Sequence, residues 1–262
     1  MLNIVAHRKS NKNVVFLMNQ APTILPWFSP RLSPSLTAVL QGLGHAMRVP
    51  RGEFVYRSPE LFGRLMYVRR GLVVKALLEP NHDDPVLMTL SGTGGLCGSY
   101  ENLYVRDHMS RAHWCVTTSE LLVVNAELLL RICDQHAEWQ VELSNYSSAS
   151  ALSDRLGLIV NHVLNPRERL GVFWILCAQQ FDKEFVAKLA TPGIEWVVSP
   201  VVPPRRVAAY ITNMESTRVG EILREWRDGH TLRYRSRKIY VRRSVFFEYW
   251  KALLPHVMPA AR

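Results

Sequence analysis

The sequence of 262 residues has few cysteines and no close pair of them. Cys97, Cys115, Cys133 and Cys177 are far apart, so we expect reduced, buried thiols rather than disulfides or metal ligands. The chain also lacks an apolar run of roughly 18 or more residues, the length that spans a membrane. Its polar N-terminus lacks the apolar segment of a signal peptide. These absences predict a cytoplasmic protein without a membrane span.

Motifs of the common enzyme classes are absent as well. HExxH, GxSxG and GxxxxGK[ST] do not occur. The Gly-rich stretch Ser91–Gly98 has neither the lysine nor the strong following helix of a phosphate loop, and Asp83 and Asp84 lie in a Pro-flanked turn. We therefore expect a protein that is not an enzyme, with no catalytic residue, no metal and no cofactor. The scattered histidines keep a haem ligand open as an alternative.

Positive charge is abundant, and it is concentrated at one end of the chain. The formal net charge is +10. Residues 203–262 contain 13 Lys or Arg and 5 Asp or Glu, a balance of +8, whereas the rest contains 19 and 17, a balance of +2. A basic region of this kind favours nucleic acid, an acidic protein or anionic lipid as a partner. The hydrophobic content of 48% excludes general disorder.

Two short helical patterns lie within the basic region. Pro203 and Pro204 suit a first helical turn, and apolar residues recur at helical spacing as far as Ile211. A second helix is expected to start near Glu215 or Ser216, with Ser216 as its cap, and Gly229 ends it. Its apolar residues are Val219, Ile222, Leu223 and Trp226. Two helices joined by a tight turn predict a helix-turn-helix, which places one helix in the major groove of DNA.

A basic strand–turn–strand follows the second helix. From Thr231 to Arg243 apolar and cationic positions alternate, and Ser236 and Arg237 are expected at the tip of a hairpin. This pattern is typical of a wing that lies along phosphates. The predicted phosphate contacts are Arg205, Arg206, Arg233, Arg235, Arg237 and Lys238. The predicted base-reading residues, at the start of the second helix, are Ser216, Thr217, Arg218 and Glu221.

The first half of the chain has a different pattern. From Met47 to about Asn125, short strand-like pieces alternate with turn residues, which predicts a β barrel or jelly roll. A short helix over Ser35–Leu43 precedes them. Further on, a heptad seam recurs at Leu152, Leu156, Ile159 and Val163. The spacing alone leaves open whether this helix packs on its own domain or on a second copy.

The order of these parts resembles the Crp/Fnr family, that of the bacterial catabolite activator protein and the fumarate-nitrate regulator. The motifs that carry the resemblance are Val49–Glu53, Leu65–Val73, Gly94–Ser99, Glu168–Val172 and Ser216–Leu223. The resemblance implies an α+β fold with a cyclic-nucleotide-binding-like jelly-roll barrel, a long central dimerisation helix and a C-terminal winged helix-turn-helix. The boundaries expected are an N-terminal extension over 1–30, the barrel over 31–130, the central helix over 131–164 and the DNA-binding domain over 165–262.

The resemblance also implies a homodimer on double-stranded DNA with a roughly palindromic site, and RNA polymerase as a further candidate partner. It makes the seam from Leu152 to Val163 the expected dimer interface. Cyclic-nucleotide-binding members carry a glutamate after the cassette glycine and a hydroxyl residue after an arginine. Here the corresponding positions are Gly98-Ser99 and Arg111-Ala112, a degenerate effector pocket, so we expect no tight binding of cyclic AMP.

Several alternatives stay open at this point. No cysteine precedes Cys97, so the iron–sulfur chemistry of the oxygen-sensing members is not expected. A redox role for Cys97 and Cys115, or gating by an unidentified small ligand, is compatible with the sequence. Arg218 either reads guanine or contacts only phosphate. A winged helix can also dock a protein, and the positive charge would then meet an acidic partner.

Overall fold

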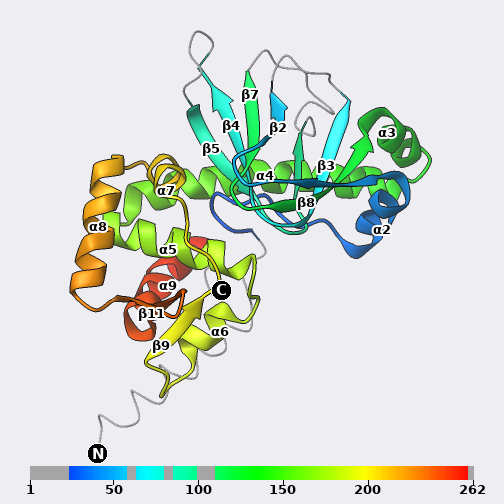
Figure 1. Ribbon diagram of the computed structural model, residues 1–262. Coiled ribbons are helices and arrows are strands. Elements are labelled where there is room, and N and C mark those ends of the chain that lie inside the picture. Colours follow the sequence, from blue (N-terminus) through cyan, green and yellow to red (C-terminus); the bar gives the residue numbers. More distant parts are fainter. Residues whose placement is uncertain (1–23, 58–62, 80–84, 99–109, 259–262) are drawn as a thin grey trace, which may run out of the picture.

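The computed structural model describes residues 24–57, 63–79, 85–98 and 110–258. Figure 1 shows β sheets in the first half of the chain and mostly helices in the second. The long helix α4 (Ala137–Val163) runs beneath the sheets toward the helical half. No helix in the described ranges is both long and apolar enough to cross a membrane.

Two four-stranded antiparallel sheets make up the β half. Their strand orders are β1-β8-β3-β6 and β2-β7-β4-β5. The first sheet consists of β1 (His45–Val49), β3 (Arg64–Arg70), β6 (Leu96–Gly98) and β8 (Ser119–Asn125). The second consists of β2 (Phe54–Arg57), β4 (Val73–Leu78), β5 (Pro85–Ser91) and β7 (Arg111–Cys115).

Strand alternation divides the apolar residues of the two sheets among three clusters. Val73 on β4 and Val123 on β8 belong to one cluster that both sheets share, so this cluster lies between the sheets. The next residue on each strand, Val74 or Val124, belongs to a different cluster on the outer face of its own sheet. Each sheet therefore has both faces covered, which explains why these strands are apolar at consecutive positions.

Helices cover the outer face of the first sheet. They are α2 (Pro34–Leu43), α3 (Ala126–Asp134) and the first half of α4, through Leu36, Leu129 and Leu143. The outer face of the second sheet packs instead on the helical half, where its cluster contains Phe173, Trp174 and Phe246. The two halves thus share one continuous apolar core.

Residues 25–29 are part of this core. Trp27 and Phe28 are almost fully buried, and Phe28 forms a parallel bridge with Leu90 on β5. Ser153 on α4 donates hydrogen bonds to the carbonyls of Leu25 and Phe28 at 2.6 and 2.7 Å. The end of the predicted N-terminal extension therefore links the second sheet to α4.

The helical half begins with α5 (Pro166–Gln179), whose Asn165–Glu168 capping box sets its start. The elements that follow are α6 (Phe185–Ala190), β9 (Trp196–Ser199), α7 (Arg205–Ile211), α8 (Ser216–Asp228), β10 (Leu232–Arg235), β11 (Lys238–Arg242) and α9 (Arg243–Val257). The three strands form an antiparallel sheet in the order β10-β11-β9.

The mixed α+β class predicted from the sequence agrees with this structure. The short strand-like pieces predicted between Met47 and Asn125 overlap β2, β3, β4, β5, β7 and β8. The strands β1 and β6 and the helix α9 were not predicted. Strand β6 has only three residues, too few to show alternation. Helix α9 contains Pro255, which reads as a helix breaker in the sequence, although it lies in the last turn.

Candidate nucleic-acid interface

Helices α7 and α8 are joined by a four-residue turn over 212–215. Asn213 adopts a left-handed backbone conformation with φ of 49°, and the Met214 amide donates to the Ala209 carbonyl at 2.9 Å. The helix starts at Ser216, as the sequence predicts. Glu215, not Ser216, occupies the N-cap position, and in the described chain no side chain caps the first turn. The first backbone N–H groups of α8 can therefore donate hydrogen bonds to an acceptor outside the helix.

Opposite faces of α8 differ sharply. Val219, Ile222 and Trp226 are buried in the core. Thr217, Glu221 and Arg224, at intervals of four and three residues, form an exposed face. Ser216 and Arg218 are half-buried at its margins. In Figure 1, α8 lies at the outer edge of the helical half, and its N-terminal end lies beside the start of β5.

Arg224 was missed in the sequence because only the N-terminal end of the helix was considered there. It lies seven residues after Thr217 and three after Glu221, so helical spacing alone places it on the same face. The exposed face therefore carries a cation three residues beyond Glu221, the last member of the predicted base-reading set.

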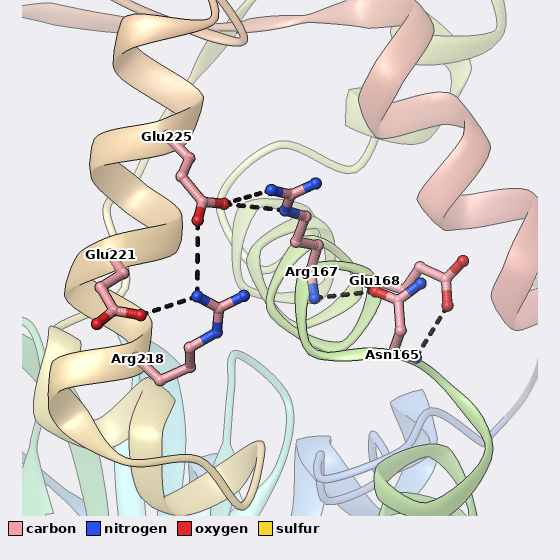
Figure 2. A network of polar contacts seen from close by, with 6 residues as sticks. All are labelled: Asn165, Arg167, Glu168, Arg218, Glu221 and Glu225. Atoms are coloured by element: carbon pink, nitrogen blue, oxygen red, sulfur yellow. Dashed lines mark hydrogen bonds and ion pairs between the residues drawn. The ribbon is translucent and has the colours of Figure 1, made fainter.

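Arg218 is held by two carboxylates of its own helix. Its Nη1 lies 2.8 Å from Oε2 of Glu221 and 3.5 Å from Oε1 of Glu225 (Figure 2). The hydrogen bond that Arg218 donates to Glu221 and the charge of Glu225 raise the pKa of Arg218 above its ordinary value. These contacts orient the guanidinium at the margin of α8.

Glu225 also links α8 to the start of α5. Its Oε2 accepts hydrogen bonds from Nε and Nη2 of Arg167 at 3.0 and 2.6 Å. Figure 2 shows Arg167 and Arg218 approaching Glu225 from two directions. Arg167 follows Asn165, whose side chain accepts the Arg167 and Glu168 amides, so its backbone is itself fixed. One carboxylate thus couples two cations from elements far apart in the sequence, a role that the sequence did not reveal.

The hairpin β10–β11 has the predicted two-residue tip. Arg235 pairs with Lys238, and Ser236 and Arg237 have φ of 50° and 60°, as a type I′ turn requires. Leu232 and Val241 face the core, whereas the alternate positions carry Arg233, Arg235, Lys238 and Arg242. Tyr234, at an apolar position of the alternating pattern, is exposed because the hairpin tip extends beyond the core.

Cations of the predicted phosphate set differ in their surroundings. The Arg233 guanidinium lies over the Trp196 ring, 4.3 Å from its centroid. Arg205 lies beside Gly220 of α8, whereas its neighbour Arg206 lines a cavity against the β half. Both arginines also line a second pocket with Pro85 and Val86 of β5, so only the first cavity distinguishes Arg206 from Arg205.

The predicted seam on α4 is uncovered in the protomer. Leu152, Ile159 and Val163 are 44%, 46% and 47% exposed, and Leu156 is half-buried. Val141 extends this stripe toward the start of the helix and is 58% exposed. Within the described part of the chain, the helix does not pack this stripe on its own domain.

The predicted effector pocket is only partly assembled. Ser99 lies outside the described residues. Gly98 donates its amide to Nδ1 of His113 at 2.9 Å, which ties β6 to β7 between the sheets. Arg111 is buried two residues before His113 and shares its face of β7. Ala112 faces the opposite way, into the outer core, because neighbouring strand residues alternate.

All four cysteines are buried. Burial raises the pKa of Cys97 to about 12, and desolvation also raises the pKa of Cys115, Cys133 and Cys177. A thiol that stays protonated is a poor nucleophile, so these environments argue against the redox alternative. Among the described residues, no group of three His, Cys, Asp or Glu side chains could hold a metal ion.

The four thiols are expected to resist Ellman's reagent at pH 8 in the folded protein and to react fully after unfolding. With a pKa of about 12, only roughly one Cys97 in 10⁴ is ionised at that pH. The unfolded thiol ionises near 9.0, so burial contributes stability below pH 9 that is lost as the pH rises. Rapid reaction of one thiol in the native protein would contradict this picture and favour a redox switch.

Comparison with known proteins places the fold. No protein-family model matches the chain, and no curated protein sequence does. The solved structure of FixK2 from Bradyrhizobium japonicum matches with a TM-score of 0.58 and 15% identity, covering 84% of this chain and 100% of that one. CLP from Xanthomonas campestris, titled a c-di-GMP-responsive global regulator, matches with a TM-score of 0.53 and 16% identity. The match covers 79% of this chain and 98% of that one.

A Eubacterium rectale protein described as a transcriptional regulator of the Crp/Fnr family matches with a TM-score of 0.53 and 10% identity, over 84% of this chain and 95% of that one. The chain therefore has the fold of Crp/Fnr-type regulators. This confirms, at the level of the fold, the resemblance predicted from the motifs. At these identities the neighbours carry no residue-level assignment.

Proposed function

We propose that the protein is a sequence-specific, DNA-binding transcription regulator of the Crp/Fnr type that acts in the cytoplasm as a homodimer and is not an enzyme. In this proposal the two four-stranded sheets are a jelly-roll sensor-like barrel and α4 is the dimerisation helix. Helices α7 and α8 with the β10–β11 hairpin form the winged helix-turn-helix. The fold neighbours support a regulator of this class.

The observation that carries the proposal is the exposed polar face of α8 beside a basic hairpin. Thr217, Glu221 and Arg224 project from one face of a helix whose other face is firmly buried. A helix of this kind fits the major groove, where such side chains reach base edges. The exposed cations of the hairpin, Arg235, Arg237 and Lys238, suit phosphates on either side.

The exposed stripe on α4 supports the dimer. Apolar residues from Val141 to Val163 extend along about 33 Å of helix at a rise of 1.5 Å per residue. Pairing of two such stripes buries surface that is costly to leave in water. Two copies of α8 would then read successive major grooves of a roughly palindromic site, with RNA polymerase as a further candidate partner.

Cyclic AMP is not expected to gate this regulator. Ala112 supplies no hydroxyl after Arg111 and faces away from the space between the sheets. The sequence also has Ser99 where a ribose-binding carboxylate would be needed. These features favour a regulator that is independent of an effector or is gated by another small ligand.

Selection from random duplex DNA, with and without cyclic AMP, tests the proposal. We expect enrichment of a roughly two-fold-symmetric site in both arms. No enrichment in either arm, together with binding to acidic proteins, would replace the proposal with a protein-docking function of the winged helix. Enrichment only with cyclic AMP would contradict the prediction about the effector.

Replacement of Arg235 with alanine is expected to weaken binding to all DNA sequences alike. Arg235 is exposed near the hairpin tip, so it can meet phosphate but is not placed to read a base. The slope of log affinity against log salt should become shallower by about one unit, as for one lost phosphate contact. Fluorescence anisotropy on specific and scrambled duplexes measures both quantities. A loss confined to one sequence would contradict a phosphate role.

A further inference from the structure

A cavity of about 430 Å³ lies between the outer face of the second β sheet and helix α7. Its walls come from β2, β4, β5 and β7 on one side and from the first turn of α7 on the other. The volume is in the range of pockets that bind small molecules. The position differs from the space between the two sheets, which contains Gly98 and His113.

The cavity has an aromatic and apolar wall. The rings of Phe54 and Trp114 lie 5.9 Å apart at 59°, and Met88 and Val207 complete the apolar lining. Phe54 is 55% exposed, although it is a large apolar residue. Contact between this apolar surface and water is unfavourable, and a flat apolar ligand would remove it by covering the ring.

Two arginines, each positively charged, also line the cavity. Arg57 lies over the Phe54 ring, 5.5 Å from its centroid, and Arg206 enters from α7. The described residues that line the cavity include no carboxylate. A guanidinium beside an apolar wall is suited to a carboxylate, which it binds with paired, charge-assisted hydrogen bonds.

We infer that this cavity binds a small molecule with a flat apolar body and one carboxylate. The apolar body packs against Phe54 and Trp114, and the carboxylate pairs with Arg206. Because Arg206 belongs to α7 and the rings belong to β strands, the ligand contacts both halves of the chain. Its occupancy is therefore expected to change DNA affinity, a consequence that rests on the proposed function.

Calorimetric titration of the full-length protein with 2-naphthoate tests the site directly. We expect saturable binding of one molecule per protomer, at least about tenfold tighter than binding of the neutral 2-naphthamide. Arg206→Gln and Phe54→Ser should each weaken binding by about tenfold or more. Both side chains are exposed, so neither change is expected to unfold the protein.

Arg205→Gln is the matched control, since Arg205 is the adjacent arginine of α7 but lies beside Gly220. Its naphthoate affinity should equal that of the unsubstituted protein. Absence of saturable binding up to roughly 5 mM would overturn the inference, and so would an equal loss in both arginine variants, which would show general attraction of anions. Calorimetry uses no DNA, so failure of the proposed function would leave this result unaffected.

Discussion

Replacement of Ile159 with aspartate is expected to convert a dimer into a monomer that binds DNA only weakly. Ile159 belongs to the exposed apolar stripe of α4 and is 46% exposed in the protomer. A carboxylate there costs little in the isolated protomer, but in the dimer it places an unpaired charge in an apolar seam. Two-fold symmetry would bring two such charges together.

Light scattering should show the mass fall from twice 30.0 kDa to 30.0 kDa. DNA affinity should approach the non-specific level, roughly 10³-fold or more weaker than specific binding. Leu158→Asp is the matched control: Leu158 is 61% exposed on the same helix but about 100° around the axis from Ile159. A dimer that persists in Ile159→Asp, or dissociates equally in both variants, would show that the interface lies elsewhere.

Replacement of Arg218 with alanine is expected to weaken specific binding by about 1–3 kcal/mol and to relax the preference at one base pair. Arg218 lies in the first turn of α8, and Glu221 and Glu225 hold its guanidinium in one orientation. A pre-oriented fork of donors is suited to guanine, which presents two acceptors in the major groove.

Arg227→Ala serves as the control for this measurement. Arg227 is an exposed arginine of the same helix that lies at its C-terminal end and pairs with Asp228. Base preferences, measured by selection with each variant, should change only for Arg218→Ala. If Arg218→Ala weakened all sequences equally and left every preference intact, Arg218 would be a phosphate contact.

Local patterns account for the elements that the sequence predicted well. Helix α8 follows from its apolar residues at helical spacing, and the hairpin follows from alternation around Ser236 and Arg237. Each depends on residues within one or two turns or on a two-residue loop. The concentration of positive charge near the C-terminus is likewise a property of composition.

Relations between distant residues could not be predicted in this way. The contact between Arg167 and Glu225 joins residues 58 positions apart, and no local pattern marks either as its partner. The spacing of the α4 seam did not decide whether the seam packs on its own domain or on a second copy. Only the packing of the protomer shows that Leu152, Ile159 and Val163 stay exposed. Such facts depend on which surfaces the folded chain covers.

The sequence by itself determined the class of fold, the two helices of the proposed DNA-binding unit and its basic hairpin, because spacing and turn chemistry act over a few residues. Only the tertiary structure decided the direction of Arg206 toward the β half and the contact of Arg167 with Glu225. Both follow from long-range packing, which brings separate elements together once the apolar core has formed.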